Sequence, residues 1–181
     1  MSSSPTPGLT RFNAAGDGVA RAALHEICAG GAWVDAVLGG RPYPTAEALY
    51  AASDAATAAL TAGGLAEAMA AHPPIGRPAP GDPVSAREQR GMAQAPPGLR
   101  AEMRALNLAY QEKFGHVFLI CATGLGAAHM LDAIRRRVGN TPEREREIVR
   151  EELGRINRIR LARLLEDPAG PPVPEQEGAR P

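Results

Sequence analysis

The sequence is poor in cysteine and aromatic residues, and the cysteine shortage excludes several kinds of site. It contains only two cysteines, Cys28 and Cys121, among 181 residues. Two cysteines this far apart provide neither a disulfide framework nor the paired spacing of a zinc site. Such sparse cysteine usage is typical of reducing compartments, so we expect a cytoplasmic protein. No other metal-ligand cluster and no glycine-rich phosphate loop is visible, and no metal is expected.

Long hydrophobic runs are also missing. No apolar stretch approaches the roughly 20 residues that a membrane-spanning helix requires, so we expect no membrane association. The N-terminal residues from Met1 to Gly8 lack a basic region followed by an apolar one. We therefore expect no secretory signal.

The chain has no excess of either charge. Twenty basic residues, of which only Lys113 is a lysine, balance twenty acidic ones. A net charge of zero gives no overall attraction to nucleic acid, and none is expected as a partner. The run Arg135-Arg136-Arg137 has no interleaved aromatic residues, so we interpret it as a solvated helix face.

What the chain does contain is enough apolar sequence for one domain with a real core. Residues 1–9 are rich in serine, proline and glycine, and residues 167–181 are rich in proline. Segments of this composition bury little, so both are predicted to be disordered tails. We assign residues 10–166 to a single helical domain.

Helical periodicity dominates this domain. The apolar spacing and the end signals predict helices over about 17–29, 45–60, 99–114, 126–138 and 141–166. Thr45 and Thr141 are suitable N-caps, and Pro142 suits a first helical position. Gly115 is expected to end the third of these helices, and the pair Gly63-Gly64 to interrupt the helical stretch that leads to His72.

One apolar run, His116 to Ala122, has the composition of a strand. No second run exists to pair with it, and a lone strand cannot satisfy its own hydrogen bonds. We interpret it as a buried extended segment or as the start of a helix. The predicted fold is therefore all-α, a single compact multi-helix domain with one buried extended segment near residues 116–123.

His72 is the first candidate for chemistry. It ends a helical stretch and precedes Pro73, which pushes it out of the α region. Imidazole suits proton transfer near neutral pH, although an isolated histidine of this kind is more often structural. Beyond a proline-rich loop, Ser85 and Glu88 open the next helix, where their spacing also fits a simple capping box.

Arg160 is the second candidate. It continues an apolar stripe of the last helix, which contains Val149, Leu153, Ile156 and Leu164. A buried guanidinium needs a partner, either a protein carboxylate or an anionic ligand. The alternative is an arginine whose stem packs at the edge of the stripe while its charged end reaches solvent.

Four motifs then occur in a fixed order, and together they resemble one family. They are His72-Pro73-x-Ile75-Gly76, Ser85-x-x-Glu88-Gln89, Asn107-x-x-Tyr110-x-x-Lys113-Phe114-Gly115-x-x-Phe118-x-Ile120-Cys121-Ala122 and Ile156-x-x-Ile159-Arg160-Leu161-x-x-Leu164-Leu165. With them, residues from about 12 to 165 resemble the 2-oxo-4-hydroxy-4-carboxy-5-ureidoimidazoline (OHCU) decarboxylases of uric acid degradation. The chain departs from the bacterial pattern at Leu125, where a basic residue is common.

The resemblance implies an all-α carboxy-lyase, usually a homodimer, that forms (S)-allantoin without a metal or organic cofactor. It assigns His72, Glu88 and Arg160 to catalysis. Substrate contacts are implied for Pro73, Ser85, Gln89, Phe118, Leu119, Ile120, Cys121 and Ala122. Two alternatives stay open: a non-catalytic helical ligand-binding or adaptor domain, and a decarboxylase or lyase for a related ureide.

Overall fold

The computed structural model describes residues 6–168, and this part of the chain folds into ten helices without a strand. The all-α prediction is confirmed. The helices are α1 (Pro7–Ala14), α2 (Asp17–Ile27), α3 (Gly31–Gly39), α4 (Ala46–Ala58), α5 (Ala62–Ala70), α6 (Pro83–Glu88), α7 (Arg90–Ala93), α8 (Pro97–Phe114), α9 (Ala127–Arg137) and α10 (Pro142–Glu166).

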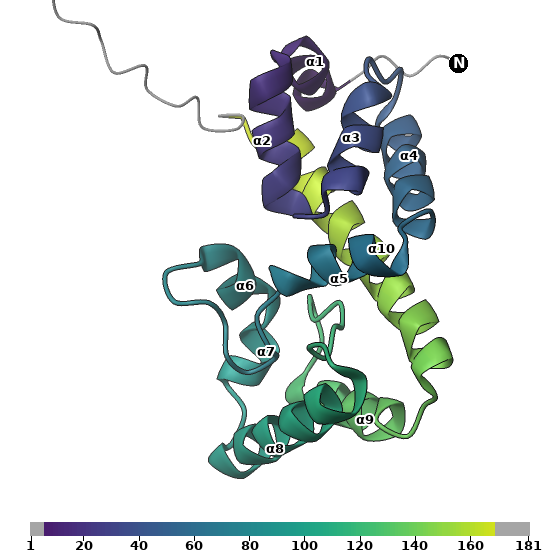
Figure 1. Cartoon of the computed structure of the whole chain (residues 1–181). Helices are drawn as coiled ribbons and strands as arrows, with labels where there is room; N and C mark the ends of the chain where they lie inside the picture. Colours follow the sequence, from purple (N-terminus) through teal and green to yellow (C-terminus); the bar gives the residue numbers. More distant parts are fainter. Residues whose placement is uncertain (1–5, 169–181) are drawn as a thin grey trace, which may run out of the picture.

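The helices form two groups, each around its own core (Figure 1). Helices α1 to α4 pack with the C-terminal part of α10 around the first core, which includes Trp33, Leu49 and Leu153. Helices α8 and α9 pack together around the second core, which includes Met103 and Met130. The 25-residue helix α10 passes from the second group to the first, so one element joins both.

The apolar run after α8 lies between the two cores. Residues 117–122 have no regular secondary structure. Leu119 belongs to the first core and Cys121 packs against it, whereas Phe118, Ile120 and Ala122 belong to the second core. This alternation with a period of two is that of an extended chain. The buried extended segment is thus confirmed, and helices, not strands, cover both of its faces.

Several helix ends form where the sequence predicts them. The hydroxyls of Thr45 and Thr141 accept hydrogen bonds from the amides of Ala48 and Arg144. Gly115 ends α8 in the left-handed conformation, with φ of 76°, which glycine adopts at no steric cost.

Two predicted boundaries were wrong. Helix α1 begins at Pro7, inside the stretch predicted as a disordered tail, because Thr6 caps it and Leu9 is completely buried. Gly63 and Gly64 do not interrupt a helix but lie in the first turn of α5, which Thr61 caps through the amide of Gly64. The break lies before Thr61 instead. Residues 1–5 and 169–181, the rest of the predicted tails, lie outside the described residues.

Candidate active site

A pocket lies where the two cores meet. Its wall includes Ile156 from the first core, Ile75 from the second, and the extended segment between them. The cavity volume of this pocket is about 20 Å³. Of the candidate residues from the sequence, the pocket is lined by His72, Pro73, Ser85, Glu88, Gln89, Phe118, Leu119, Ile120 and Ala122. The fold therefore brings together segments that are far apart in the sequence.

His72 follows the end of α5 and is 8% exposed. Its backbone amide donates to the carbonyl of Met69, whereas its imidazole makes no hydrogen bond within residues 6–168. The pKa of His72 is lowered from 6.5 to about 4, chiefly by burial and then by the nearby charge of Arg160, while Glu88 opposes this shift. The imidazole is consequently neutral at neutral pH and has an unshared nitrogen lone pair to accept a proton.

Arg160 and Glu88 form a two-pronged ion pair beside His72. Nε of Arg160 donates to Oε1 of Glu88 at 2.8 Å, and Nη2 donates to Oε2 at 2.9 Å. Nη1 donates to the carbonyl of Ile27 at 2.9 Å, and the two charged side chains are only 14% and 12% exposed. The inward arginine thus has a carboxylate partner and does not reach out to solvent. Arg160 is adjacent to the pocket through Glu88 but does not line it.

This pairing decides whether Glu88 is a partner in a capping box with Ser85. The capping-box alternative is wrong, since Asp82 caps α6 by accepting from the amides of Val84 and Ser85. The Glu88 side chain instead pairs with Arg160. The carboxylate hydrogen-bonds Arg160 and lies 3.6 Å from Nη1 of Arg163, so it acts on His72 only through its charge.

Ser85 and Gln89 brace the loop between α5 and α6. The hydroxyl of Ser85 accepts from the amide of Ala79 at 3.2 Å and donates to the carbonyl of Asp82 at 3.3 Å. Oε1 of Gln89 accepts from the amide of Gly76 at 2.9 Å, and Nε2 donates to the carbonyl of Pro73 at 3.5 Å. Both side chains are buried, so their polar groups hold this wall of the pocket in place.

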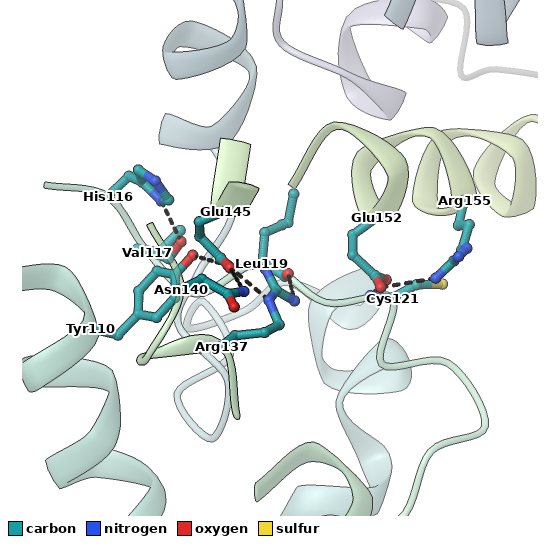
Figure 2. A network of polar contacts seen from close by, with 10 residues as sticks. All are labelled: Tyr110, His116, Val117, Leu119, Cys121, Arg137, Asn140, Glu145, Glu152 and Arg155. Carbon is teal, nitrogen blue, oxygen red and sulfur yellow. Dashed lines mark hydrogen bonds and ion pairs between the residues drawn. The ribbon is translucent and has the colours of Figure 1, made fainter. Parts of the chain in front are cut away.

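The extended segment is held from outside the pocket (Figure 2). Nη1 of Arg137 donates to the carbonyl of Leu119 at 2.8 Å, and Oε2 of Glu152 accepts from the amide of Cys121 at 2.9 Å. Cys121 itself does not line the pocket, unlike the other four candidate residues of this segment. Burial raises the pKa of its thiol, and the charge of Glu152 adds to this effect.

Sequence reasoning missed Arg137. It belongs to the run interpreted as a solvated face, yet it is 7% exposed and pairs with the fully buried Glu145. Arg135, in contrast, is on the surface and pairs with Glu102 and Asp132. The signal was present, because Met130, Ala133, Ile134 and Arg137 follow helical spacing on one face. The same reasoning identified Arg160.

The family model for OHCU decarboxylase matches residues 13–162. The chain belongs to the OHCU decarboxylase family. It is 31% identical over 140 residues to the 2-oxo-4-hydroxy-4-carboxy-5-ureidoimidazoline decarboxylase of Amia calva, a match that covers 74% of this chain and 80% of the relative. It is 32% identical over 136 residues to the uric acid degradation bifunctional protein TTL of Arabidopsis thaliana, covering 71% of this chain. The match spans only 42% of that longer protein.

Solved structures agree with this membership. A crystal structure of OHCU decarboxylase in the presence of (S)-allantoin superposes with a TM-score of 0.70 at 29% identity, covering 84% of this chain and all of the other. A crystal structure of (S)-allantoin synthase has a TM-score of 0.66, covers 86% of this chain and 53% of the other, and at 19% identity supports the fold alone. Sequence and fold therefore both support membership of the OHCU decarboxylase family.

Residues 6–168 contain neither a cluster of metal ligands nor a helix that could span a membrane. No three His, Cys, Asp or Glu side chains in this range are arranged to hold a metal ion. None of the helices there combines the length and the apolar character needed to cross a membrane.

Proposed function

We propose that this protein decarboxylates 2-oxo-4-hydroxy-4-carboxy-5-ureidoimidazoline to (S)-allantoin in the pocket between the two cores. The observation that carries the proposal is that the buried, neutral His72 and Glu88 line one pocket, with Arg160 paired to Glu88. Family membership supports the reaction class, and one relative bears the name of this substrate.

The substrate provides its own electron sink. Its carboxylate and hydroxyl share a ring carbon next to a C=N bond, so the electron pair released with CO2 moves into that bond, whose nitrogen takes a proton. The resulting enol loses its hydroxyl proton and takes one at the neighbouring carbon, which gives allantoin. Since no external electron acceptor enters this scheme, we propose a cofactor-independent reaction in which the protein positions the ring and moves protons.

His72 is proposed as the acid/base group. As a neutral imidazole it accepts the hydroxyl proton of the enol that loss of CO2 leaves, and it then delivers that proton to the neighbouring carbon. An isolated cation at this depth would be costly, but the enolate formed in the same step offsets the charge of a protonated imidazole.

Arg160 is proposed to bind the substrate's anionic group. A guanidinium has five N–H donors, and three of them are engaged with Glu88 and Ile27, which leaves two. Glu88 is proposed to orient Arg160 and to supply a compensating charge. In this proposal, Ser85, Gln89 and the backbone at Pro73 contact the ureido arm, and backbone groups from Phe118 to Ala122 contact the ring.

Two further properties belong to the proposal. We propose a homodimer, which the family resemblance supports and which sedimentation equilibrium will test. We also propose a cytoplasmic location, in keeping with the two free cysteines.

The decisive assay generates the unstable substrate in the cuvette with urate oxidase and hydroxyisourate hydrolase. With the wild-type protein we expect optically active (S)-allantoin to form faster than the spontaneous reaction. His72→Asn should stay folded and lose about 10²- to 10⁴-fold in rate, the usual contribution of a general acid/base group. A folded wild-type protein without effect on the rate would favour the adaptor alternative, and selective turnover of another ureide would favour a related lyase.

A further inference from the structure

The extended segment has an unusual hydrogen-bond pattern. From Phe118 to Cys121, only two backbone groups bond to another group among residues 6–168: the carbonyl of Leu119 and the amide of Cys121. Residues two apart in an extended chain direct their peptide groups to the same edge. Arg137 and Glu152 therefore hold one edge of the segment, and the peptide groups at Phe118 and Ile120 point to the opposite edge.

Neither Arg137 nor Glu152 lines the pocket, whereas Phe118, Leu119 and Ile120 do. The two charged side chains are thus outside the pocket wall, to which residues of the extended segment contribute. Buried peptide groups without a partner are rare in proteins, and such groups at a pocket point to a ligand that pairs with them.

The contact at Leu119 rests on a buried network (Figure 2). Glu145 is fully buried and accepts from Nε of Arg137 at 2.7 Å, from Nδ2 of Asn140 at 2.8 Å and from the hydroxyl of Tyr110. Nη2 of Arg137 lies 2.6 Å from the same carboxylate without the alignment of a hydrogen bond. The guanidinium also lies 4.5 Å from the centre of the Phe118 ring. Helices α8, α9 and α10 thereby fix one carbonyl.

Tyr110 keeps its proton in this network. Burial raises the pKa of Tyr110 above its usual range, and Glu145 adds to the shift. The phenol therefore stays protonated at neutral pH and donates to Glu145, which also forms an ion pair with Arg137.

We propose that Arg137 and Glu152 are positioning residues for the reaction. They fix the extended segment by one backbone edge, so that its other edge presents rigid peptide groups to the substrate ring at a set distance from His72. This inference rests on the proposed function for its kinetic test. A displacement of about 1 Å in a positioning element costs up to about 100-fold in rate, which sets the size of the expected effect.

Arg137→Lys is the first test. Lysine keeps the positive charge beside Glu145, but its single ammonium group does not replace the planar fork that serves Glu145 and Leu119 together. We expect kcat to fall by at least about tenfold at a temperature well below Tm, with the pH profile of kcat/KM unchanged. Arg135→Lys makes the same chemical change on the same helix at a surface pair and should leave kcat unaltered.

Glu152 gives a second test with a conservative rescue. Glu152→Ala removes the acceptor of the Cys121 amide, and kcat should again fall about tenfold. Glu152→Gln retains a carbonyl oxygen at that place and should keep near-normal kcat. A purely structural role would lower Tm in Arg137→Lys and Glu152→Ala while the folded variants kept wild-type kcat, and that result would overturn the proposal.

Hydrogen–deuterium exchange tests the same proposal without an activity assay. Peptides covering residues 116–124 should exchange faster in Arg137→Lys and Glu152→Ala than in the wild type, while peptides from α2 and α3 stay unchanged. Unchanged exchange in residues 116–124 would overturn the proposal even if the enzyme is active. If the wild-type protein is inactive and the two variants still exchange faster than it does, the proposed reaction is rejected and the positioning of the segment by Arg137 and Glu152 stands.

Discussion

Arg160 and Glu88 form an ion pair of opposite charges that is nearly buried. Each has the other as its principal partner, through two hydrogen bonds of 2.8 and 2.9 Å. Such a pair is weak evidence for stability as a whole, but removing one member leaves the other charge without compensation. A substitution of Glu88 is therefore expected to lower both the free energy of unfolding and the rate of turnover.

Glu88→Gln tests this coupling. Glutamine has one acceptor oxygen and one donor NH2 group. Its NH2 group would face an N–H donor of Arg160, so one of the two hydrogen bonds is lost. We expect a loss of about 3 kcal/mol in unfolding free energy and a strong fall in allantoin formation. Glu102→Gln, at a surface pair 40–47% exposed, is the matched control and should cost less than about 1 kcal/mol. Equal effects of the two changes in urea unfolding would contradict the buried-pair argument.

His72 makes stability depend on pH. Because its pKa is about 4 in the folded protein and 6.5 otherwise, the unfolded chain binds more protons between these values. The contribution is complete above about pH 6.5 and is lost as the pH falls towards 4, by about 3 kcal/mol in total. Urea unfolding at pH 7 and pH 4 should show this extra loss in the wild type and not in His72→Gln.

The same pKa governs the acid limb of catalysis. We expect kcat/KM of the wild type to fall with an apparent pKa near 4, since neutral His72 is the proposed base of the free enzyme. A limb near 6.5 would mean that His72 titrates as an exposed histidine does, and the burial argument would then be wrong.

At the scale of elements, the sequence predicted helix ends best where a residue caps its own neighbours. Thr45, Thr141 and Gly115 all act within a few residues, and all three were recognised. Thr61 and Asp82 use the same local chemistry but were missed in favour of Gly63-Gly64 and Ser85. Each of these segments contains two plausible signals, and packing of the following helix decides between them.

Close packing of α7 yields an element-scale prediction. A Cβ on Gly91 would lie 2.0 Å from the carbonyl oxygen of Leu125, in the turn that follows the extended segment. Gly91→Ala should therefore destabilise the protein by about 2 kcal/mol or more, because backbone must move. Gly98→Ala, in the first turn of α8 with nothing within 4 Å, should be neutral or stabilising by up to about 1 kcal/mol. Thermal melts of the two variants compare them directly.

At the scale of the whole molecule, the sequence predicted one helical domain but not its two cores. Apolar spacing assigns a residue to a helix face, whereas the core that receives that face depends on contacts between distant segments. The same limit applies to the site. The family resemblance indicated which residues belong to it, while the Glu88–Arg160 pair and the Arg137 network depend on side-chain directions that only the fold provides.

The two cores share α10 and the extended segment, so we expect them to unfold together. Trp33 is the only tryptophan and is buried in the first core, so its fluorescence reports on that core. Far-UV circular dichroism reports on the helices of both groups. The two signals should give one coincident urea transition. A second dichroism transition without a fluorescence change would show that the second core unfolds on its own.

The placement of the pocket at the meeting of the cores also has a consequence for folding kinetics. Its residues come from separate stretches around 72–75, 85–89, 118–123 and 156, so no early local structure contains the site. Contacts between distant segments form late, after the cost of loop closure has been met. During refolding from urea, helical dichroism should therefore recover before allantoin-forming activity does. Newly made chains would then acquire their helices first and their catalytic competence last.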